Sequence, residues 1–233
     1  MIKAVFFDLY QTLVGYNPPR EEIGARVLRD FGIEIKPEEL SRPMTVADEY
    51  FITENARSPI RQRSPEDRAA AFTRYQAVML KEAGIKSSPE LIAAIIGKWH
   101  NSSFKLVLFD DVIPVLSGLK QRGLVLGLIS NVDSDITPIL KDLGLAPLLD
   151  VVATSLDTGY TKPQPEIFRE AVSRACVKAD EALFVGDQYQ IDVLGAEKAG
   201  LKGLLLDRGG HFKGVGDCPY IRNLNQLDEH LPR

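Results

Sequence analysis

The chain has 233 residues, of which 45% are hydrophobic, and a formal net charge of -4. This length allows one large domain or a domain with a substantial insertion. The charge balance shows no basic excess, which argues against a nucleic acid or an anionic membrane surface as partner and favours a soluble enzyme. The N-terminal run MIKAVFFD is too short for a signal peptide, and no later run approaches a membrane span, so we expect a cytoplasmic protein.

The first apolar run, Ile2 to Phe7, predicts a strand buried on both faces, and it ends at Asp8. In open parallel α/β sheets, ligands bind at the carboxyl ends of the strands, where Asp8 would stand. Taken alone, Asp8 could equally cap the following structure. A cluster of turn-forming residues between positions 14 and 20 then predicts that the chain leaves the sheet.

The next ninety or so residues show helical spacing of apolar positions without a strand pattern. Ser64-Pro65-Glu66 and Ser88-Pro89-Glu90 are typical helix starts, and Gly32 and Gly84 are typical helix stops. The predicted helices cover residues 20–31, 37–56, 65–83 and 89–100. We interpret residues 15–106 as an all-helical cap domain inserted into a core made of residues 1–14 and 107–233.

Strands alternate with helices again after residue 107. Apolar strands are predicted at 124–129, 150–154, 182–185 and 203–206, and helices lie between them, with a hinge and a helix before the first and a short helix at 225–230. Such alternation requires right-handed crossovers and predicts an α/β fold with a doubly wound parallel sheet. The two cysteines, Cys176 and Cys218, stand in unrelated contexts, so no disulfide is expected.

The ends of these strands carry polar side chains. Asp8, Ser130 and Asp187 each follow an apolar strand, and Lys162 lies in the loop after another. Because the carboxyl ends of parallel strands share one edge of the sheet, we expect these four side chains to meet there.

DLYQT at 8–12, Ser130, Lys162 in KPQPEIF and VGDQYQIDVLGAEKAG at 185–200 together resemble the four motifs of the haloacid dehalogenase-like (HAD) hydrolases. Each motif is weak alone, but four in order at strand ends form a specific signal. The resemblance covers the core, and it extends to the cap only in helical character and position.

The resemblance implies that Asp8 is a nucleophile that forms a covalent ester with the substrate. Ser130 would donate a hydrogen bond to a substrate oxygen, and Lys162 would hold Asp8 and neutralise charge on the transferring group. Thr12 would orient Asp8, although a turn-stabilising hydroxyl is an almost equal alternative. We expect Asn131 to contact the substrate.

We expect the substrate to be a small anionic molecule. Arg42 is the cap residue most expected to contact it, because the early cap of the family's dehalogenases also supplies an arginine.

Three carboxylates in one cleft would repel one another unless a hard cation lies among them. Mg²⁺ suits such oxygen ligands, and the family's phosphatases imply Asp8, the main-chain carbonyl of Tyr10, and Asp187 as its ligands. Asp192 would assist nearby or through water, with a helix-capping role at about even weight.

Two departures from the family pattern point in opposite directions. Family phosphatases usually carry an aspartate as general acid two residues after the nucleophile, but this chain has Tyr10, as the 2-haloacid dehalogenases do. Those dehalogenases lack the metal-binding aspartate that is present here as Asp187. An acidic cleft would also repel a 2-halo carboxylate.

We therefore expect a Mg²⁺-dependent phosphatase acting on a good leaving group. The alternatives are a metal-independent 2-haloacid dehalogenase and a catalytically weak phosphate-binding or regulatory protein.

Overall fold

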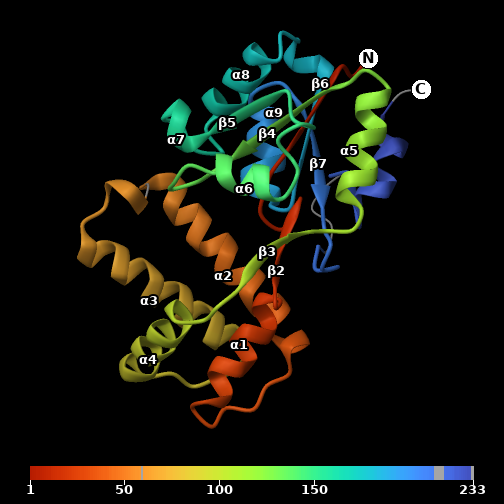
Figure 1. Ribbon diagram of the computed structural model, residues 1–233. Coiled ribbons are helices and arrows are strands. Elements are labelled where there is room, and N and C mark those ends of the chain that lie inside the picture. Colours follow the sequence, from red (N-terminus) through yellow and green to blue (C-terminus); the bar gives the residue numbers. More distant parts are fainter. Residues whose placement is uncertain (59, 213–217, 232–233) are drawn as a thin grey trace. The chain divides into compact units, whose positions relative to one another are not determined.

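The computed structural model describes residues 1–58, 60–212 and 218–231. The chain forms two compact units (Figure 1). The core unit comprises Met1–Gly15 and Val107–Arg233, and the helical unit comprises Tyr16–Leu106. Each unit has its own cluster of buried apolar side chains, which is the property expected of a separate domain.

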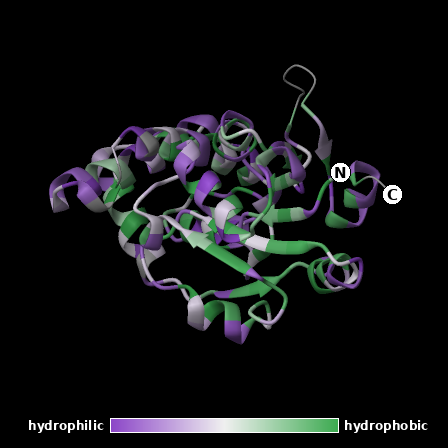
Figure 2. Cartoon of the chain, turned by 90° about the horizontal axis from the view of Figure 1, so that it is seen from above, coloured by the Kyte–Doolittle hydropathy of each residue, from purple (hydrophilic) through white to green (hydrophobic). Residues whose placement is uncertain are grey.

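A six-stranded sheet forms the centre of the core unit, in the order β5-β4-β1-β6-β7-β8, and every described pair of neighbours is parallel. This confirms the predicted α/β class with a parallel sheet. All four side chains of β1 are buried, as are all five of β6, because helices cover both faces of such a sheet. Figure 2 shows the strands as largely hydrophobic. The strands are β1 (Ala4–Phe7), β4 (Val125–Ser130), β5 (Val151–Thr154), β6 (Ala182–Gly186), β7 (Lys202–Leu206) and β8 (Tyr220–Ile221).

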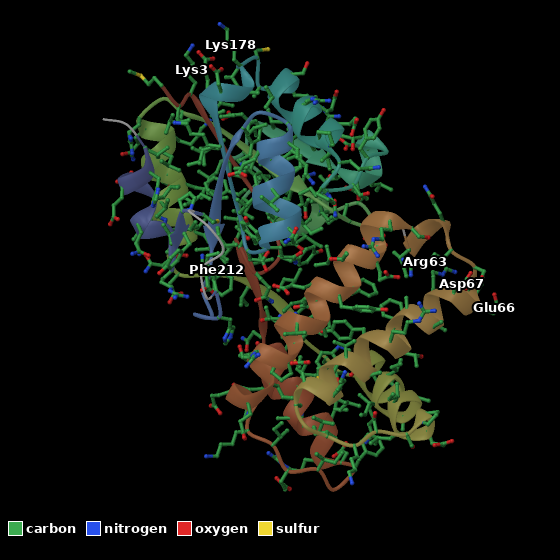
Figure 3. The ribbon with its side chains drawn as sticks, turned by 180° about the vertical axis from the view of Figure 1, so that it is seen from behind. Lys3, Arg63, Glu66, Asp67, Lys178 and Phe212 are labelled. Carbon is green, nitrogen blue, oxygen red and sulfur yellow. The ribbon has the colours of Figure 1, made fainter. Side chains whose placement is uncertain are left out.

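Helices α8 (Pro165–Arg174) and α9 (Leu194–Lys198) bury their apolar side chains against one face of this sheet. Phe168 of α8 meets Phe184 of β6 edge to face, with ring centroids 5.2 Å apart. The core unit also contains α5 (Val112–Gln121), α6 (Thr137–Asp142), α7 (Ser155–Thr158) and a C-terminal 3-10 helix (Leu224–His230). Charged side chains such as Lys3 and Lys178 lie on the outer surface of the unit (Figure 3).

Four helices make up most of the helical unit, at the predicted positions: α1 (Arg20–Arg29), α2 (Pro37–Arg57), α3 (Pro65–Glu82) and α4 (Pro89–His100). Ser64 and Ser88 cap α3 and α4, as predicted, by accepting hydrogen bonds from the backbone of Asp67 and Leu91. Beyond the end of α3, Gly84 has φ +71°, which glycine adopts without strain. Among the described residues, no helix is long and apolar enough to cross a membrane.

The connections between the two units are strands, which the sequence pattern did not predict. β2 (Val14–Asn17) and β3 (Lys105–Leu108) pair as a separate two-stranded sheet. Each is only four residues long and partly exposed, so neither carries a clear apolar pattern. Their stability depends on pairing with a segment about ninety residues away, which local sequence does not encode.

A largely buried ion pair joins distant segments of the core unit. Arg208, which follows β7, forms two hydrogen bonds of 2.8 and 2.9 Å with the carboxylate of Asp111. Its guanidinium also donates to the Thr12 carbonyl at 3.0 Å and lies 4.0 Å from the Phe109 ring centroid. Asp111 further accepts a hydrogen bond from the Leu224 backbone. This pair therefore fixes the loop after β1, the start of α5 and the C-terminal segment together.

We predict that Asp111→Asn lowers the free energy of unfolding by about 2 kcal/mol at pH 7, because hydrogen bonds to charged groups are worth more than neutral ones. Burial raises the pKa of Asp111, but Arg208 and the Leu224 amide outweigh burial, so the folded pKa lies below its usual value. The carboxylate therefore stabilises the fold above the unfolded pKa, and the benefit is lost as the pH falls through the folded pKa. In urea unfolding, the difference in free energy of unfolding between the wild type and Asp111→Asn should become smaller from about pH 5 downward.

Asp228→Asn is the matched control, because Asp228 pairs with Arg122 on the surface with 75% of its side chain exposed. It should change stability by less than about 1 kcal/mol. A stability difference between the wild type and Asp111→Asn that stays constant down to about pH 3 would show that the charge of Asp111 does not cause the stabilisation.

Candidate active site

The candidate active site lies at the carboxyl ends of three neighbouring strands. Asp8 follows β1, Ser130 is the last residue of β4, and Asp187 follows β6, while β4 and β6 flank β1 in the sheet. Parallel pairing therefore brings these residues to one edge. The Asp8 backbone amide also donates to the Val185 carbonyl at 2.9 Å, which fixes the start of the loop after β1.

Lys162 places a buried ammonium between two carboxylates. Its Nζ lies 2.6 Å from Asp8 Oδ1 and 2.6 Å from Asp192 Oδ1, and only 3% of its side chain is exposed. The ammonium also lies 5.1 Å from the centroid of the Phe184 ring. Burial of the ammonium alone would be costly, so the two carboxylates are what keep Lys162 charged at this position.

The pKa values of Lys162 and Asp192 are shifted because two carboxylates share one ammonium. Burial favours neutral Lys162, but the charges of Asp192 and Asp8 outweigh burial and raise its pKa. For Asp192, burial raises the pKa, and the neighbouring Lys162 only partly offsets that rise. Both directions are consistent with a site that holds more negative charge than its own lysine can neutralise.

Asn131 fixes the backbone of Lys162. Its Oδ1 accepts from the Lys162 amide at 2.8 Å, and its Nδ2 donates to the Lys162 carbonyl at 3.0 Å. We expected Asn131 to contact the substrate, but both ends of its amide are engaged with Lys162. Ser130, in contrast, directs its hydroxyl to Asp8 Oδ1 at 3.4 Å, and it is 1% exposed.

A tight loop follows Asp8. Gln11 has φ +60°, a left-handed conformation that non-glycine residues rarely adopt, and its amide donates to the Val14 carbonyl at 2.7 Å. Tyr10 is half-buried and forms an isolated bridge with Val14. Thr12 is completely buried, and its hydroxyl finds no hydrogen-bond partner among the described residues, so the predicted bond to Asp8 is not formed.

Asp192 is held by a π-helical turn, Tyr189–Val193, which lies between β6 and α9. Such turns often occur at functional sites. The Gln188 amide donates to Asp192 Oδ2 at 3.0 Å, so both oxygens of Asp192 accept hydrogen bonds. A Cβ added to Gly186 would lie 2.3 Å from Asp192 Oδ2. Glycine at 186 is therefore required for Asp192 to approach the end of β6.

The donor set fits a divalent cation. Carboxylate oxygens of Asp8, Asp187 and Asp192 lie within 4.8 Å of one another. Three negative charges against the single positive charge of Lys162 leave a formal charge of -2. Hard oxygen donors in this number suit Mg²⁺, which binds through one or two carboxylates and completes its shell with water and substrate.

The structure adds one residue to the predicted site, Gly186, and places one predicted residue, Arg42, in the helical unit. Gly186 was seen only as part of the fourth motif, although a glycine between a strand and an acidic turn is a usable signal of close approach. Arg42, the predicted substrate contact, is exposed on α2 of the helical unit.

We predict that Gly186→Ala lowers the free energy of unfolding by about 1–3 kcal/mol, because the added methyl group forces Asp192 out of its place. Chemical denaturation measures this change. Gly118→Ala on α5 is the control, since its Cβ would meet no atom within 4 Å. It should stabilise the protein by about 0.5–1 kcal/mol through helix propensity. Equal effects of the two substitutions would contradict the packing argument.

Comparisons with known proteins agree with this geometry. A family model described as haloacid dehalogenase-like hydrolase matches residues 5–206. The chain is 32% identical over 217 residues to the glyceraldehyde 3-phosphate phosphatase of Methanopyrus kandleri, over 90% of this chain and 85% of that relative.

Two solved structures resemble the chain over 98% of its length and 97% of their own. One is a HAD phosphatase from Thermococcus onnurineus, with a TM-score of 0.58 and 25% identity. The other is a 2-haloacid dehalogenase from Pseudomonas syringae pv. Tomato DC3000, with a TM-score of 0.58 and 27% identity. With its four motifs gathered at one sheet edge and the family match running from β1 to β7, the chain belongs to the haloacid dehalogenase-like hydrolases.

Proposed function

We propose that this hydrolase is a cytoplasmic, Mg²⁺-dependent phosphatase that acts on a small phosphorylated metabolite through an aspartyl-phosphate on Asp8. The formal charge of -2 on the cluster of Asp8, Asp187, Asp192 and Lys162 carries the proposal. Without a cation, this cluster would repel a phosphate and a 2-halo carboxylate alike. A divalent ion would cancel this formal charge and remove the repulsion of an anionic substrate. The phosphatase from Methanopyrus kandleri supports the same choice.

Asp8 is the proposed nucleophile because of how it is held. Among the described residues, both of its side-chain hydrogen bonds end on Oδ1, from Lys162 and Ser130. Oδ2 is then the oxygen that attacks phosphorus, forming an O–P bond as the bond to the leaving oxygen breaks. Water next attacks the aspartyl-phosphate, which releases inorganic phosphate and restores the carboxylate.

Lys162 and Ser130 would stabilise the charge that gathers on the phosphoryl oxygens. Asp8, the Tyr10 carbonyl and Asp187 would hold Mg²⁺, which would supply positive charge to the transferring group. Asp192, whose two oxygens are already engaged, would act by positioning Lys162.

Tyr10 determines which leaving groups suit this site. A phenol is a much weaker acid than the carboxylic acid that family phosphatases place here, so the departing oxygen receives little help from position 10. We therefore propose that good substrates have leaving groups that depart without a proton, such as acyl or aryl phosphates.

We predict that Asp8→Asn lowers phosphate release from p-nitrophenyl phosphate by about 10³-fold or more, because the amide cannot form the ester. Removal of Mg²⁺ with a chelator should abolish the wild-type activity, and added Mg²⁺ should restore it. Mg²⁺ should also raise the melting temperature of the wild type, and Asp187→Asn should lose this shift.

Asp142→Asn, at the exposed end of α6, is the matched control and should behave as the wild type. Phosphate release that persists in Asp8→Asn would refute the mechanism. Metal-independent halide release from 2-haloacids would instead support the dehalogenase that Tyr10 allows. Binding of phosphate and Mg²⁺ without turnover of any compound would support a regulatory protein.

We also predict that Tyr10→Asp raises kcat for alkyl phosphates by about 10²-fold, since a general acid contributes that much or more when the leaving group is poor. The rate for p-nitrophenyl phosphate should change little, because its leaving group departs unprotonated. Tyr10→Phe serves as the control and should raise neither rate. An equal gain for both substrates would mean that position 10 acts on binding and not on proton transfer.

A further inference from the structure

The helical unit contains a cavity of about 330 Å³ that the proposed chemistry does not use. All of its lining residues belong to this unit, and they come from α1 to α4, from β2 and from the residue before β3. This volume lies at the lower end of the range found for small-molecule sites. Six lining residues are aromatic: Tyr16, Phe51, Phe72, Tyr75, Trp99 and Phe104.

The aromatic side chains form connected walls. Phe51 stacks on Phe72 with ring centroids 5.5 Å apart and meets Tyr75 edge to face at 6.0 Å. Phe72 is 41% exposed. An aromatic wall next to an open cavity offers a flat ligand the offset or edge contacts that aromatic rings prefer.

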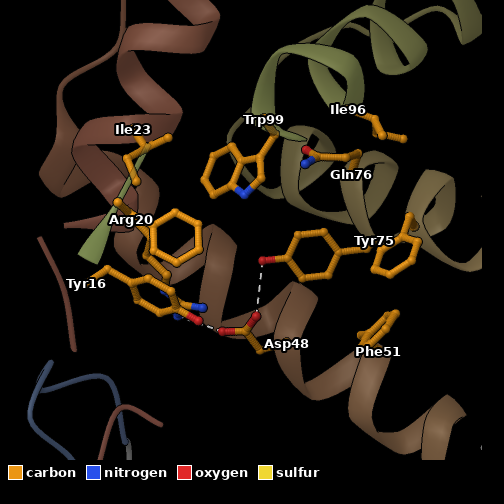
Figure 4. A pocket seen from close by; sticks show the side chains of 11 residues that line it. Tyr16, Arg20, Ile23, Asp48, Phe51, Tyr75, Gln76, Ile96 and Trp99 are labelled. Carbon is orange, nitrogen blue, oxygen red and sulfur yellow. Dashed lines mark hydrogen bonds and ion pairs between the residues drawn. The ribbon is translucent and has the colours of Figure 1, made fainter. Parts of the chain in front are cut away.

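The charges in the wall balance each other. Arg20 Nη2 lies 2.6 Å from Asp48 Oδ2, and Tyr75 donates its hydroxyl to Asp48 Oδ1 at 3.1 Å. Figure 4 shows the Tyr75 hydroxyl directed at Asp48. Burial raises the pKa of both Tyr16 and Tyr75, so these phenols stay neutral at physiological pH. The lining therefore carries one positive and one negative charge, which favours a neutral ligand over a phosphate.

Gln76 supplies a polar group without a protein partner. The residue is 6% exposed, and its Oε1 has no hydrogen-bond partner among the described residues. Figure 4 shows its amide among the side chains that line the cavity. A buried amide oxygen without a donor costs free energy, and a ligand N–H or O–H would recover it.

We propose that this cavity binds a neutral aromatic molecule that donates one hydrogen bond to Gln76. The aromatic walls would hold the ring, and the Gln76 oxygen would select the donor. All of the residues that form this site belong to the helical unit, and its existence does not depend on the phosphatase proposal.

Phenol and toluene form a matched pair of probes, because they have similar shape and only phenol donates a hydrogen bond. Trp99 is the only tryptophan in the chain, so its fluorescence reports binding directly when excited at wavelengths that phenol does not absorb. We expect both probes to change Trp99 emission saturably. The ratio of the affinity for phenol to the affinity for toluene should be about fivefold higher in the wild type than in Gln76→Leu, which corresponds to one net hydrogen bond.

Gln76→Leu should remain folded, because it replaces an unpaired buried amide by an apolar group of similar size. It should bind toluene at least as well as the wild type and lose the preference for phenol. Gln62→Leu, an exposed position outside the cavity, should keep the wild-type preference. Should Gln76→Leu fail to fold, Phe72→Ala provides the second test, and it should weaken both probes alike.

Unchanged Trp99 emission with both probes up to their solubility would overturn the proposal, as would an unaltered phenol preference in Gln76→Leu. A phosphatase assay with added phenol shows whether the ligand of the cavity is part of the substrate or a separate molecule. Competition with substrate would indicate that the cavity receives part of the substrate, and an unchanged KM would indicate a separate ligand. Failure of the phosphatase assay leaves the fluorescence result standing, so the two proposals fail separately.

Discussion

The core unit depends on one buried ammonium. Lys162 contacts Asp8 and Asp192 at 2.6 Å each, and its own backbone is fixed by the amide of Asn131. A charge removed from water is tolerated only with such partners, so the position of Lys162 and the positions of the two acids determine one another. The proposed nucleophile, Asp8, is therefore oriented by electrostatics before any substrate arrives, which is the preorganisation on which catalysis by charge stabilisation relies.

Much of this arrangement could be predicted from the sequence because it follows from topology. Asp8, Ser130 and Asp187 each end an apolar strand, and parallel strands bring their carboxyl ends to one edge whatever their separation along the chain. The four helices of the helical unit were predictable for a local reason. Their start signals, such as Ser64 and Ser88, act within a few residues of where they stand.

The remaining features depend on contacts that no local pattern contains. The clearance between Gly186 and Asp192 arises from a π-helical turn, and the use of the Asn131 amide depends on the loop that carries Lys162. In the helical unit, Gln76 could not be distinguished from an ordinary surface glutamine, since its burial results from how α3 packs with its neighbours. Residues whose role is set by tertiary packing are the ones that sequence reasoning misses.

The pairing of β2 with β3 has a consequence for the history of the chain. The two ends of the segment Tyr16–Leu106 lie in strands that pair with each other, so the chain leaves the core and returns to it at neighbouring points. Loop-closure entropy grows only slowly with length once such ends are joined, and insertions are tolerated where termini lie close together. Natural recombination could therefore exchange this module for one of different size without disrupting the sheet whose strand β1 leads to Asp8.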